Sequence, residues 1–261
     1  MRTMKVLKTT IRPLGHRGLC ARLMPRGQAA PHQRPSKFVL WLLLALSLSV
    51  VHCPLSIAQP IAQSIAQSPA REVFLAAPDT IFPLLTAVNR ADFVDFLESK
   101  MRAEVTNRLE GRSEMTRLTD DYIHIRMTKA TTWEMKVLAL TDSTAVVCTV
   151  STACGPACDS HVQFYTTDWQ PLPTTTFLPA RPTMAEFIAP LPADTLASAA
   201  YLEARAQADV TLIRADLSAT EPTLTLTLTT PDYMSGDAAD LIRPQLLPAR
   251  VYTWRDGRFV P

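Results

Sequence analysis

The residues from 121 to 169 carry the longest alternation of apolar and polar side chains in the chain, together with three cysteines. A period of two residues is typical of β-strands with one buried face. We predict strands at 121–127, 133–140, 144–152 and 159–167, with turns at Asp142-Ser143 and Gly155-Pro156. These strands form a four-stranded antiparallel meander whose buried face needs a covering layer.

The register of this meander follows from keeping the apolar side chains together. We place Ile125 opposite Met135, Val137 opposite Cys148, and Cys148 opposite Phe164. A one-residue slip would exchange the two faces of a strand, so the register is a sharp prediction. The predicted buried face consists of Ile123, Ile125, Met127, Trp133, Met135, Val137, Val146, Cys148, Val150, Val162 and Phe164.

The other face of the meander is predicted to be polar and exposed. The register sets Arg126 opposite Glu134, an ion pair that contributes about 0.2–1 kcal/mol to the choice of register. The outward residues on this face are His124, Lys136, Thr149, Ser151, His161, Gln163 and Tyr165.

A helix before the meander is the natural cover for its apolar face. Asn89 is predicted to cap this helix, with Asp92 at its third position. Apolar residues then recur at three- and four-residue spacing, as in an amphipathic helix packed on a core. They are Phe93, Phe96, Leu97, Met101 and Val105.

The C-terminal part repeats the order of helix and then strands after a proline-rich linker. Thr183 to Glu186 has a capping-box pattern, and 194–208 is predicted to be helical. Strands are predicted at 209–215, 222–230, 251–254 and 258–260, and the last two flank an Asp256-Gly257 hairpin turn. The predicted class is α+β: an antiparallel β-meander covered by an amphipathic helix, followed by a second, smaller helix-plus-strands unit. This repeated order suggests a divergent tandem repeat.

The N-terminal region looks like an export signal. An apolar run from Phe38 to Val51 follows Lys37 and is shorter than the ~20 residues that span a bilayer. Competing interpretations are an uncleaved anchor and lipidation at Cys53. We predict four regions: a basic extension and signal peptide at 1–58, a flexible tether at 59–72, a first α+β unit at 73–173 and a second at 174–261.

The net charge of +2 hides an acidic mature protein. Nine Lys and Arg residues lie within residues 1–37, before the first acid, Glu72, and the rest of the chain has 17 basic and 24 acidic residues. Nucleic acid is therefore not an expected partner. The mature form is also predicted to have no membrane span.

The sequence offers few residues for catalysis. His124 and His161 lack the spacing to other ligands that metal sites use, so no metal site and no cofactor are predicted. Cys154 and Cys158 form a candidate disulfide across the hairpin tip, with Cys148 as a buried free thiol.

Three residues are candidate binding residues. Tyr165 and Trp169 belong to an aromatic strip that also includes Tyr252 and Trp254, and His161 lies near the hairpin tip. Packing of these aromatic residues against the opposite layer is the competing interpretation.

Six segments of the mature chain have distinctive sequences: PLLTAVNRADFVDFLESKM, AEVTNR, SEMTRLTDDYI, CTVSTACGPACDS, FYTTDW and LTTPDYM. Together they resemble an exported Bacteroidales family catalogued as domain of unknown function 3256. The resemblance covers roughly Ala76 to Phe259. It implies an exported α+β domain without an assigned activity, so it supplies no catalytic residues. The long basic extension before the signal departs from the family pattern. It suggests that translation starts further along the chain, with Met24 as an alternative start.

We therefore expect an exported protein of unknown biochemical function that acts as a non-enzymatic binding module of the periplasm or cell surface. Its partner would be an envelope protein or a peptide. The alternative is an envelope hydrolase or a thiol-redox enzyme that uses His161 beside Cys154 and Cys158.

Export makes a prediction about the mature N-terminus. Small residues at Ser56 and Ala58 suit a signal peptidase, so the mature chain should begin between Gln59 and Ser68. Intact-mass measurement of protein recovered from the periplasm checks this. A mass that still includes Phe38 to Val51 would instead indicate an anchor.

Overall fold

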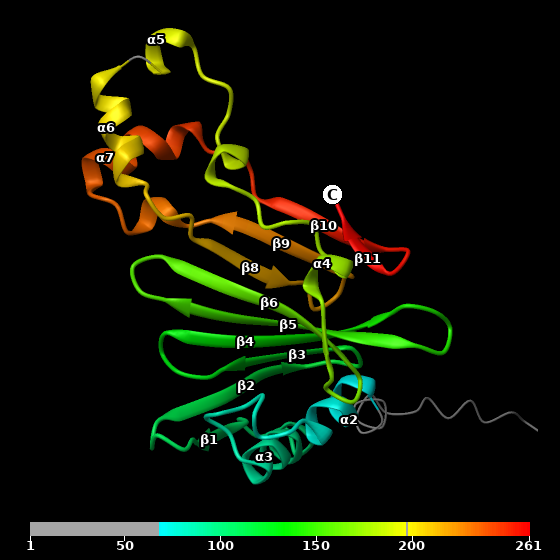
Figure 1. Ribbon diagram of the computed structural model, residues 1–261. Coiled ribbons are helices and arrows are strands. Elements are labelled where there is room, and N and C mark those ends of the chain that lie inside the picture. The colour runs from blue at the N-terminus through cyan, green and yellow to red at the C-terminus, as the bar shows by residue number, and fades with distance from the viewer. Residues whose placement is uncertain (1–67, 197) are drawn as a thin grey trace, which may run out of the picture. The chain divides into compact units, whose positions relative to one another are not determined.

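The computed structural model describes residues 68–196 and 198–261. The signal segment, Cys53 and most of the tether lie outside these residues. The described residues belong to one compact unit with two antiparallel sheets (Figure 1). The predicted α+β class is confirmed.

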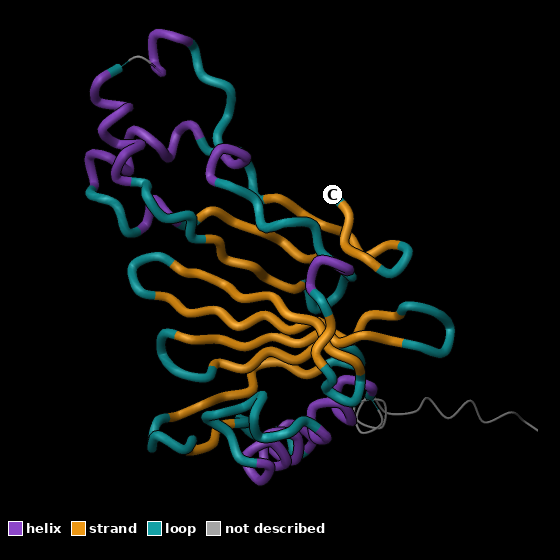
Figure 2. Tube along the Cα trace, in the orientation of Figure 1, coloured by secondary structure: helices purple, strands orange, loops and turns teal. Residues whose placement is uncertain are grey.

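The first sheet is a seven-stranded antiparallel meander in which the spatial order of the strands equals their order in the chain (Figure 2). The four predicted strands are β3 to β6, and further strands extend the sheet at both edges. The seven are β1 (Glu104–Thr106), β2 (Arg112–Leu118), β3 (Tyr122–Arg126), β4 (Thr131–Ala139), β5 (Ala145–Cys154), β6 (Cys158–Thr166) and β7 (Pro171–Leu172).

The predicted register of the β4–β5 hairpin is wrong by one residue. Val137 lies opposite Val147, and Lys136 lies opposite Cys148. The cause is a three-residue loop at 141–143, closed by a bond from Leu140 N–H to Thr144 O, where a two-residue turn was expected. This shift by one residue places the side chains of Val146, Cys148 and Val150 on one face of the sheet and those of Trp133 and Met135 on the other face.

The predicted register of the β3–β4 hairpin is wrong by two residues. Ile123, and not Ile125, lies opposite Met135, because the loop spans only 128–130 and is closed by Met127 N–H bonding to Thr131 O. A shift of two residues keeps each side chain on its predicted face. The predicted pairs of Cys148 with Phe164 and of Cys154 with Cys158 are confirmed.

The expected ion pair between Arg126 and Glu134 is also wrong. Glu134 lies opposite His124, and Arg126 pairs with Glu114 on β2. Glu134 and Lys136 are not on an exposed face, because each is buried beneath the second sheet.

Helices cover one face of the first sheet. They are α2 (Pro69–Ala76) and α3 (Ala87–Glu98), and α2 includes the last four residues of the expected tether. Phe74 and Phe93, from these helices, share a hydrophobic core with Trp133, Met135 and Val147. This face is therefore covered as predicted, and Trp133 is buried.

Helix α3 begins and ends earlier than predicted. Its N-cap is Thr86, which forms a capping box with Asn89. The helix stops at Glu98, so Met101 is exposed in the following turn and Val105 lies in strand β1. Phe93 is fully buried, whereas Phe96 and Leu97 are partly buried.

The second sheet has the order β11-β10-β9-β8. Its strands are β8 (Ile213–Leu217), β9 (Thr223–Leu228), β10 (Arg250–Arg255) and β11 (Arg258–Val260). The predicted Asp256-Gly257 turn joins the last two, with both residues at positive φ. The alternating leucines of β9 and the even-numbered side chains of β5 and β6 form a second core, which includes Val146, Cys148, Val150, Phe164, Leu224, Leu226 and Leu228.

Short helices lie at one end of the second sheet and beside its strands β10 and β11 (Figure 1). They are α4 (Thr174–Phe177), η1 (Met184–Phe187), α5 (Ala193–Leu196), α6 (Ala199–Gln207), η2 (Thr230–Asp232), α7 (Gly236–Ile242) and η3 (Arg243–Gln245). Among the described helices, none is both long enough and apolar enough to cross a bilayer.

The two faces of β6 should respond differently to truncation. Phe164 is fully buried and stacks on Phe177 with ring centroids 4.9 Å apart, so Phe164→Ala should cost about 3–5 kcal/mol. Exposed His161→Ala should change the free energy of unfolding by about 0.5 kcal/mol or less. Thermal and chemical unfolding measure both. Equal losses would show that the buried and exposed faces of β6 are assigned incorrectly.

Candidate functional site

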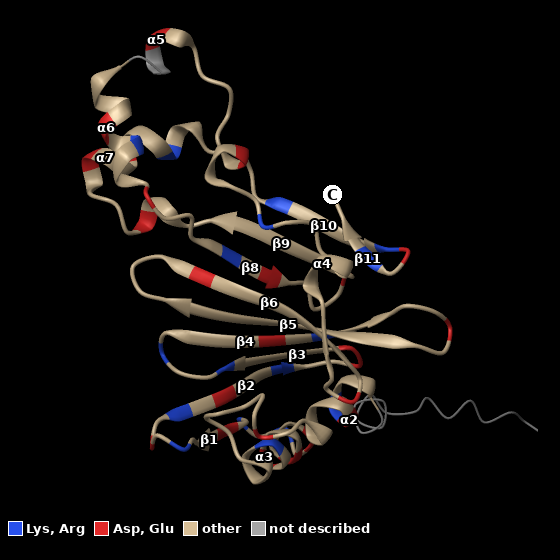
Figure 3. Cartoon of the chain, in the orientation of Figure 1, with Lys and Arg blue, Asp and Glu red and all other residues tan. Residues whose placement is uncertain are grey.

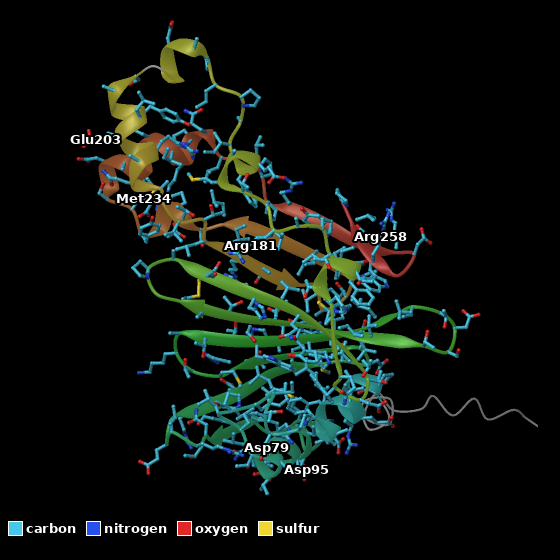
Figure 4. The ribbon with its side chains drawn as sticks, in the orientation of Figure 1. Asp79, Asp95, Arg181, Glu203, Met234 and Arg258 are labelled. Atoms are coloured by element: carbon cyan, nitrogen blue, oxygen red, sulfur yellow. A yellow bond between two sulfur atoms is a disulfide. The ribbon has the colours of Figure 1, made fainter. Side chains whose placement is uncertain are left out.

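The predicted disulfide lies at the tip of the β5–β6 hairpin. Cys154 and Cys158 are joined by a disulfide bond, drawn in yellow in Figure 4. Gly155 N–H donates to Ala157 O and closes the tip. The Thr229 hydroxyl, directly after β9, donates to Cys158 O, so the tip is also tied to the second sheet.

Cys148 is a free thiol in the core between the sheets. Burial raises the pKa of this thiol, so it is not a nucleophile at neutral pH. Its position opposite Phe164 agrees with the prediction.

Tyr165 and Trp169 pack on each other, with ring centroids 5.3 Å apart. Trp169 is only 5% exposed, and its indole N–H donates to Val73 O near the C-terminal end of α2. Carbonyls in the last turn of a helix lack helical partners, so this bond serves the packing of α2 on the sheet. Trp254 likewise packs against Phe164 and Phe259. These rings all contribute to packing within the fold.

His161 lies apart from this aromatic pair and lines a pocket of about 260 Å³. The pocket lies between β6, the segment after β7 and the second sheet. Its walls combine aliphatic side chains and prolines with polar groups from Ser160, His161, Thr174, Thr175, Arg181 and Tyr252. The lining residues are Ser160, His161, Val162, Thr174, Thr175, Leu178, Pro179, Ala180, Arg181, Pro182, Ile213, Ala215, Leu226 and Tyr252.

The pocket lies beside an unpaired part of the β6 edge. Strand β7 pairs only with Phe164 and Tyr165. Along an antiparallel strand, backbone groups point to alternate neighbours, and the carbonyls of Cys158 and Ser160 point away from β5. The N–H and C=O of Val162 therefore point toward the same edge, where β7 does not reach.

Arg181 closes one end of this edge (labelled in Figure 4). Its guanidinium donates to Ser160 O at 3.0 Å and pairs with the Asp159 carboxylate. It also reaches Thr211 O, before β8. One side chain from the linker thus holds β6 and the second sheet together at the pocket.

Side chains of the first sheet hold strand β8, which forms one wall of the pocket. Asp159 Oδ1 accepts from Ile213 N–H at 3.0 Å, and Ser160 Oγ accepts from Ala215 N–H at 2.9 Å. A third bond runs from Leu217 N–H to Glu134 Oε2 at 2.7 Å. Charged residues on β4, β6 and β8 are visible in Figure 3.

Glu134 is the electrostatically unusual member of this set. Burial raises the pKa of its carboxyl from 4.5 to about 7, and Asp216 adds to this, while the Leu217 N–H and Arg214 oppose it. Its Oε1 lies 4.0 Å from His124 Nε2. Burial, helped by Arg126, lowers the pKa of His124, so the imidazole is neutral at pH 7.

The lining of the pocket offers few groups that are typical of catalysis. Its lining contains a histidine but neither a cysteine nor a carboxylate. Across residues 68–196 and 198–261, no three His, Cys, Asp or Glu side chains gather as metal ligands would. The structure thus brings His161 to a pocket, but it does not bring the disulfide cysteines or Trp169 to the same pocket.

Several pocket residues could not be recognised from the sequence. Leu178, Ala180 and Arg181 belong to the proline-rich stretch that was interpreted as a linker. A single Arg inside an apolar, proline-rich stretch is a weak signal, because it gives no indication of the β6 carbonyl that it bonds. Tyr252, interpreted as part of an exposed aromatic strip, is buried in the pocket wall.

The fold and site define a class: an α+β domain with two antiparallel sheets and a small apolar pocket at an edge strand. A family model described as "Protein of unknown function (DUF3256)" matches residues 61–259. The chain belongs to this family.

A solved structure of a domain of an uncharacterized protein from Porphyromonas gingivalis W83 has the same fold. It matches with a TM-score of 0.65 at 28% sequence identity, over 74% of this chain and 98% of that one. No curated protein matches the chain.

Glu134 should make stability depend on pH. The folded pKa lies above the unfolded value, so the stabilisation by the protonated carboxyl is complete below about pH 4.5 and is lost as the pH rises through about 7. Glu134→Gln keeps an acceptor for Leu217 N–H but cannot ionise. Its stability relative to wild type should therefore rise by up to about 3 kcal/mol between pH 5 and pH 8.

Unfolding by urea at several pH values measures this difference. Glu203→Gln, on the exposed surface of α6, is the control for loss of one carboxylate. A constant difference between Glu134→Gln and wild type across this range would show that Glu134 does not titrate as described.

Proposed function

We propose that this chain is an exported, non-enzymatic binding module of the cell envelope. Its site is the pocket beside β6, which receives one large apolar side chain from an extended segment of a partner protein. The observation that carries the proposal is the combination of this pocket with the unpaired backbone of Val162.

The size and lining of the pocket favour a side chain as its occupant. Its volume of about 260 Å³ is below the roughly 300–1,000 Å³ of small-molecule sites. Val162, Leu178 and Leu226 provide apolar contacts at its walls. A single apolar group buried there would gain hydrophobic free energy from contact with these side chains.

The edge of β6 provides the second element of recognition. An extended segment that adds to a sheet edge gains main-chain hydrogen bonds, while its alternate side chains enter pockets. Here the open edge is short, limited by Leu172 on one side and Arg181 on the other. We therefore propose a brief backbone contact at Val162 together with one anchoring side chain.

Two features support export. The apolar run of Phe38 to Val51 is suited to a signal peptide. The Cys154–Cys158 disulfide fits an oxidising compartment, because such bonds are rare in the cytosol.

Selection of displayed random peptides on the purified mature protein tests the proposal. Enriched peptides should share one large apolar or aromatic position. Ala180 is exposed and lines the pocket, so Ala180→Trp should fill it and weaken binding of the selected peptides at least about tenfold, roughly 1.4 kcal/mol.

The matched control is Ala91→Trp, on the exposed side of α3 outside the pocket, which should bind as wild type does. Selected peptides that bind Ala180→Trp as tightly as wild type would place the site elsewhere. Failure to enrich any sequence would also argue against a peptide-binding pocket.

A further inference from the structure

A second pocket, of about 410 Å³, lies between the segment that follows η1 and helix α6. It shares no described lining residue with the pocket beside β6. Leu202, which is 55% exposed, belongs to its lining. The described lining residues are Ala185, Ile188, Ala189, Pro190, Leu191, Tyr201, Leu202 and Arg205.

Arg205 is the one charged side chain in this lining. Its Nη1 is buried and has no hydrogen-bond partner within the part of the chain that the structure describes. A buried donor without an acceptor is unfavourable, and a buried cationic group more so. The planar guanidinium matches the geometry of a carboxylate, which can accept two parallel N–H bonds from it.

The remaining walls suit a hydrocarbon and not a peptide. Ile188, Leu191 and Leu202 are aliphatic, and the described lining has no Ser, Thr, Asn or Gln side chain. The backbone of the segment is already engaged, because Ala189 N–H donates to Gln245 O at 2.8 Å and Ile188 is bridged to Leu246. A peptide amide in this pocket would leave its polar groups without partners.

We infer that this second pocket binds a small free aliphatic carboxylic acid. The carboxylate lies on the Arg205 guanidinium, and the hydrocarbon chain lies along Ile188, Leu191 and Leu202. The charge of the ligand then compensates the partly buried Arg205 guanidinium, and the apolar chain covers the exposed leucine. The volume of about 410 Å³ is within the range of small-molecule pockets.

Isothermal titration calorimetry of the mature protein at pH 8 tests the inference, with octanoate as the ligand and 1-octanol as its uncharged analogue. Octanoate should bind saturably, and 1-octanol should bind at least tenfold more weakly. Arg205→Gln should weaken octanoate binding at least tenfold. Arg255→Gln, which removes an exposed arginine from the end of β10, should leave it unchanged.

A variant that fills the second pocket provides an independent test in case Arg205→Gln does not fold. Ala185 is exposed and lines the pocket, so Ala185→Phe should abolish octanoate binding while the melting temperature stays near that of wild type. Ala180→Trp, which fills the other pocket, should bind octanoate normally, so this inference and the proposed peptide site can fail separately.

Three results would overturn the inference. The first is equal affinity for octanoate and 1-octanol, and the second is unchanged octanoate binding by Arg205→Gln. The third is tighter binding of N-acetyl-glycyl-leucine than of octanoate, since that would assign the pocket to a peptide C-terminus.

Discussion

The position of the second sheet depends on hydrogen bonds from one strand edge to side chains of the first sheet. The edge of a sheet presents a row of N–H groups that must find acceptors when it is buried. Strand β8 pairs with β9 along one edge and meets this requirement along its other edge without a strand. Three of its alternate amides donate to side chains on β4 and β6: Ile213 to Asp159, Ala215 to Ser160 and Leu217 to Glu134. Because these bonds fix β8, they also fix the core behind it and the wall of the pocket beside β6.

The period-two pattern was sufficient to predict the class of fold, most strands and the buried leucines of β9, but not which face of each strand meets which core. The decisive detail is the loop after β4. The Thr141 hydroxyl accepts from the N–H groups of Ser143 and Thr144, which stabilises three loop residues where a two-residue turn was expected. One added residue reverses the faces of β5 and β6 relative to β4. Glu134 was predicted to face solvent. Its carboxylate instead accepts a hydrogen bond from Leu217 N–H, 83 positions later in the chain, which no local pattern could indicate.

From the sequence, only those features of the candidate site that lie within a single hairpin could be predicted. A disulfide across a four-residue separation follows from the hairpin that contains it, and so does the exposure of His161. The pocket beside β6 is lined by residues from β6, the proline-rich linker, β8, β9 and β10. Because these segments are far apart in the chain, none of them indicates a pocket by its own sequence. The same holds for Arg205, whose position in α6 is unremarkable in sequence and whose pocket is completed by residues that precede α5 in the chain.

The strand order of the first sheet has a consequence for how this protein acquires its structure. Each strand from β2 to β7 pairs with the strand that directly precedes it in the chain, so the contacts are short in sequence and quickly formed. A chain that emerges N-terminus first from a ribosome or a translocation channel can therefore add each strand to the sheet as that strand emerges. The second sheet cannot satisfy the amides of β8 until β4 and β6 are in place. We therefore expect the N-terminal meander to form first and the second sheet to pack on it afterwards.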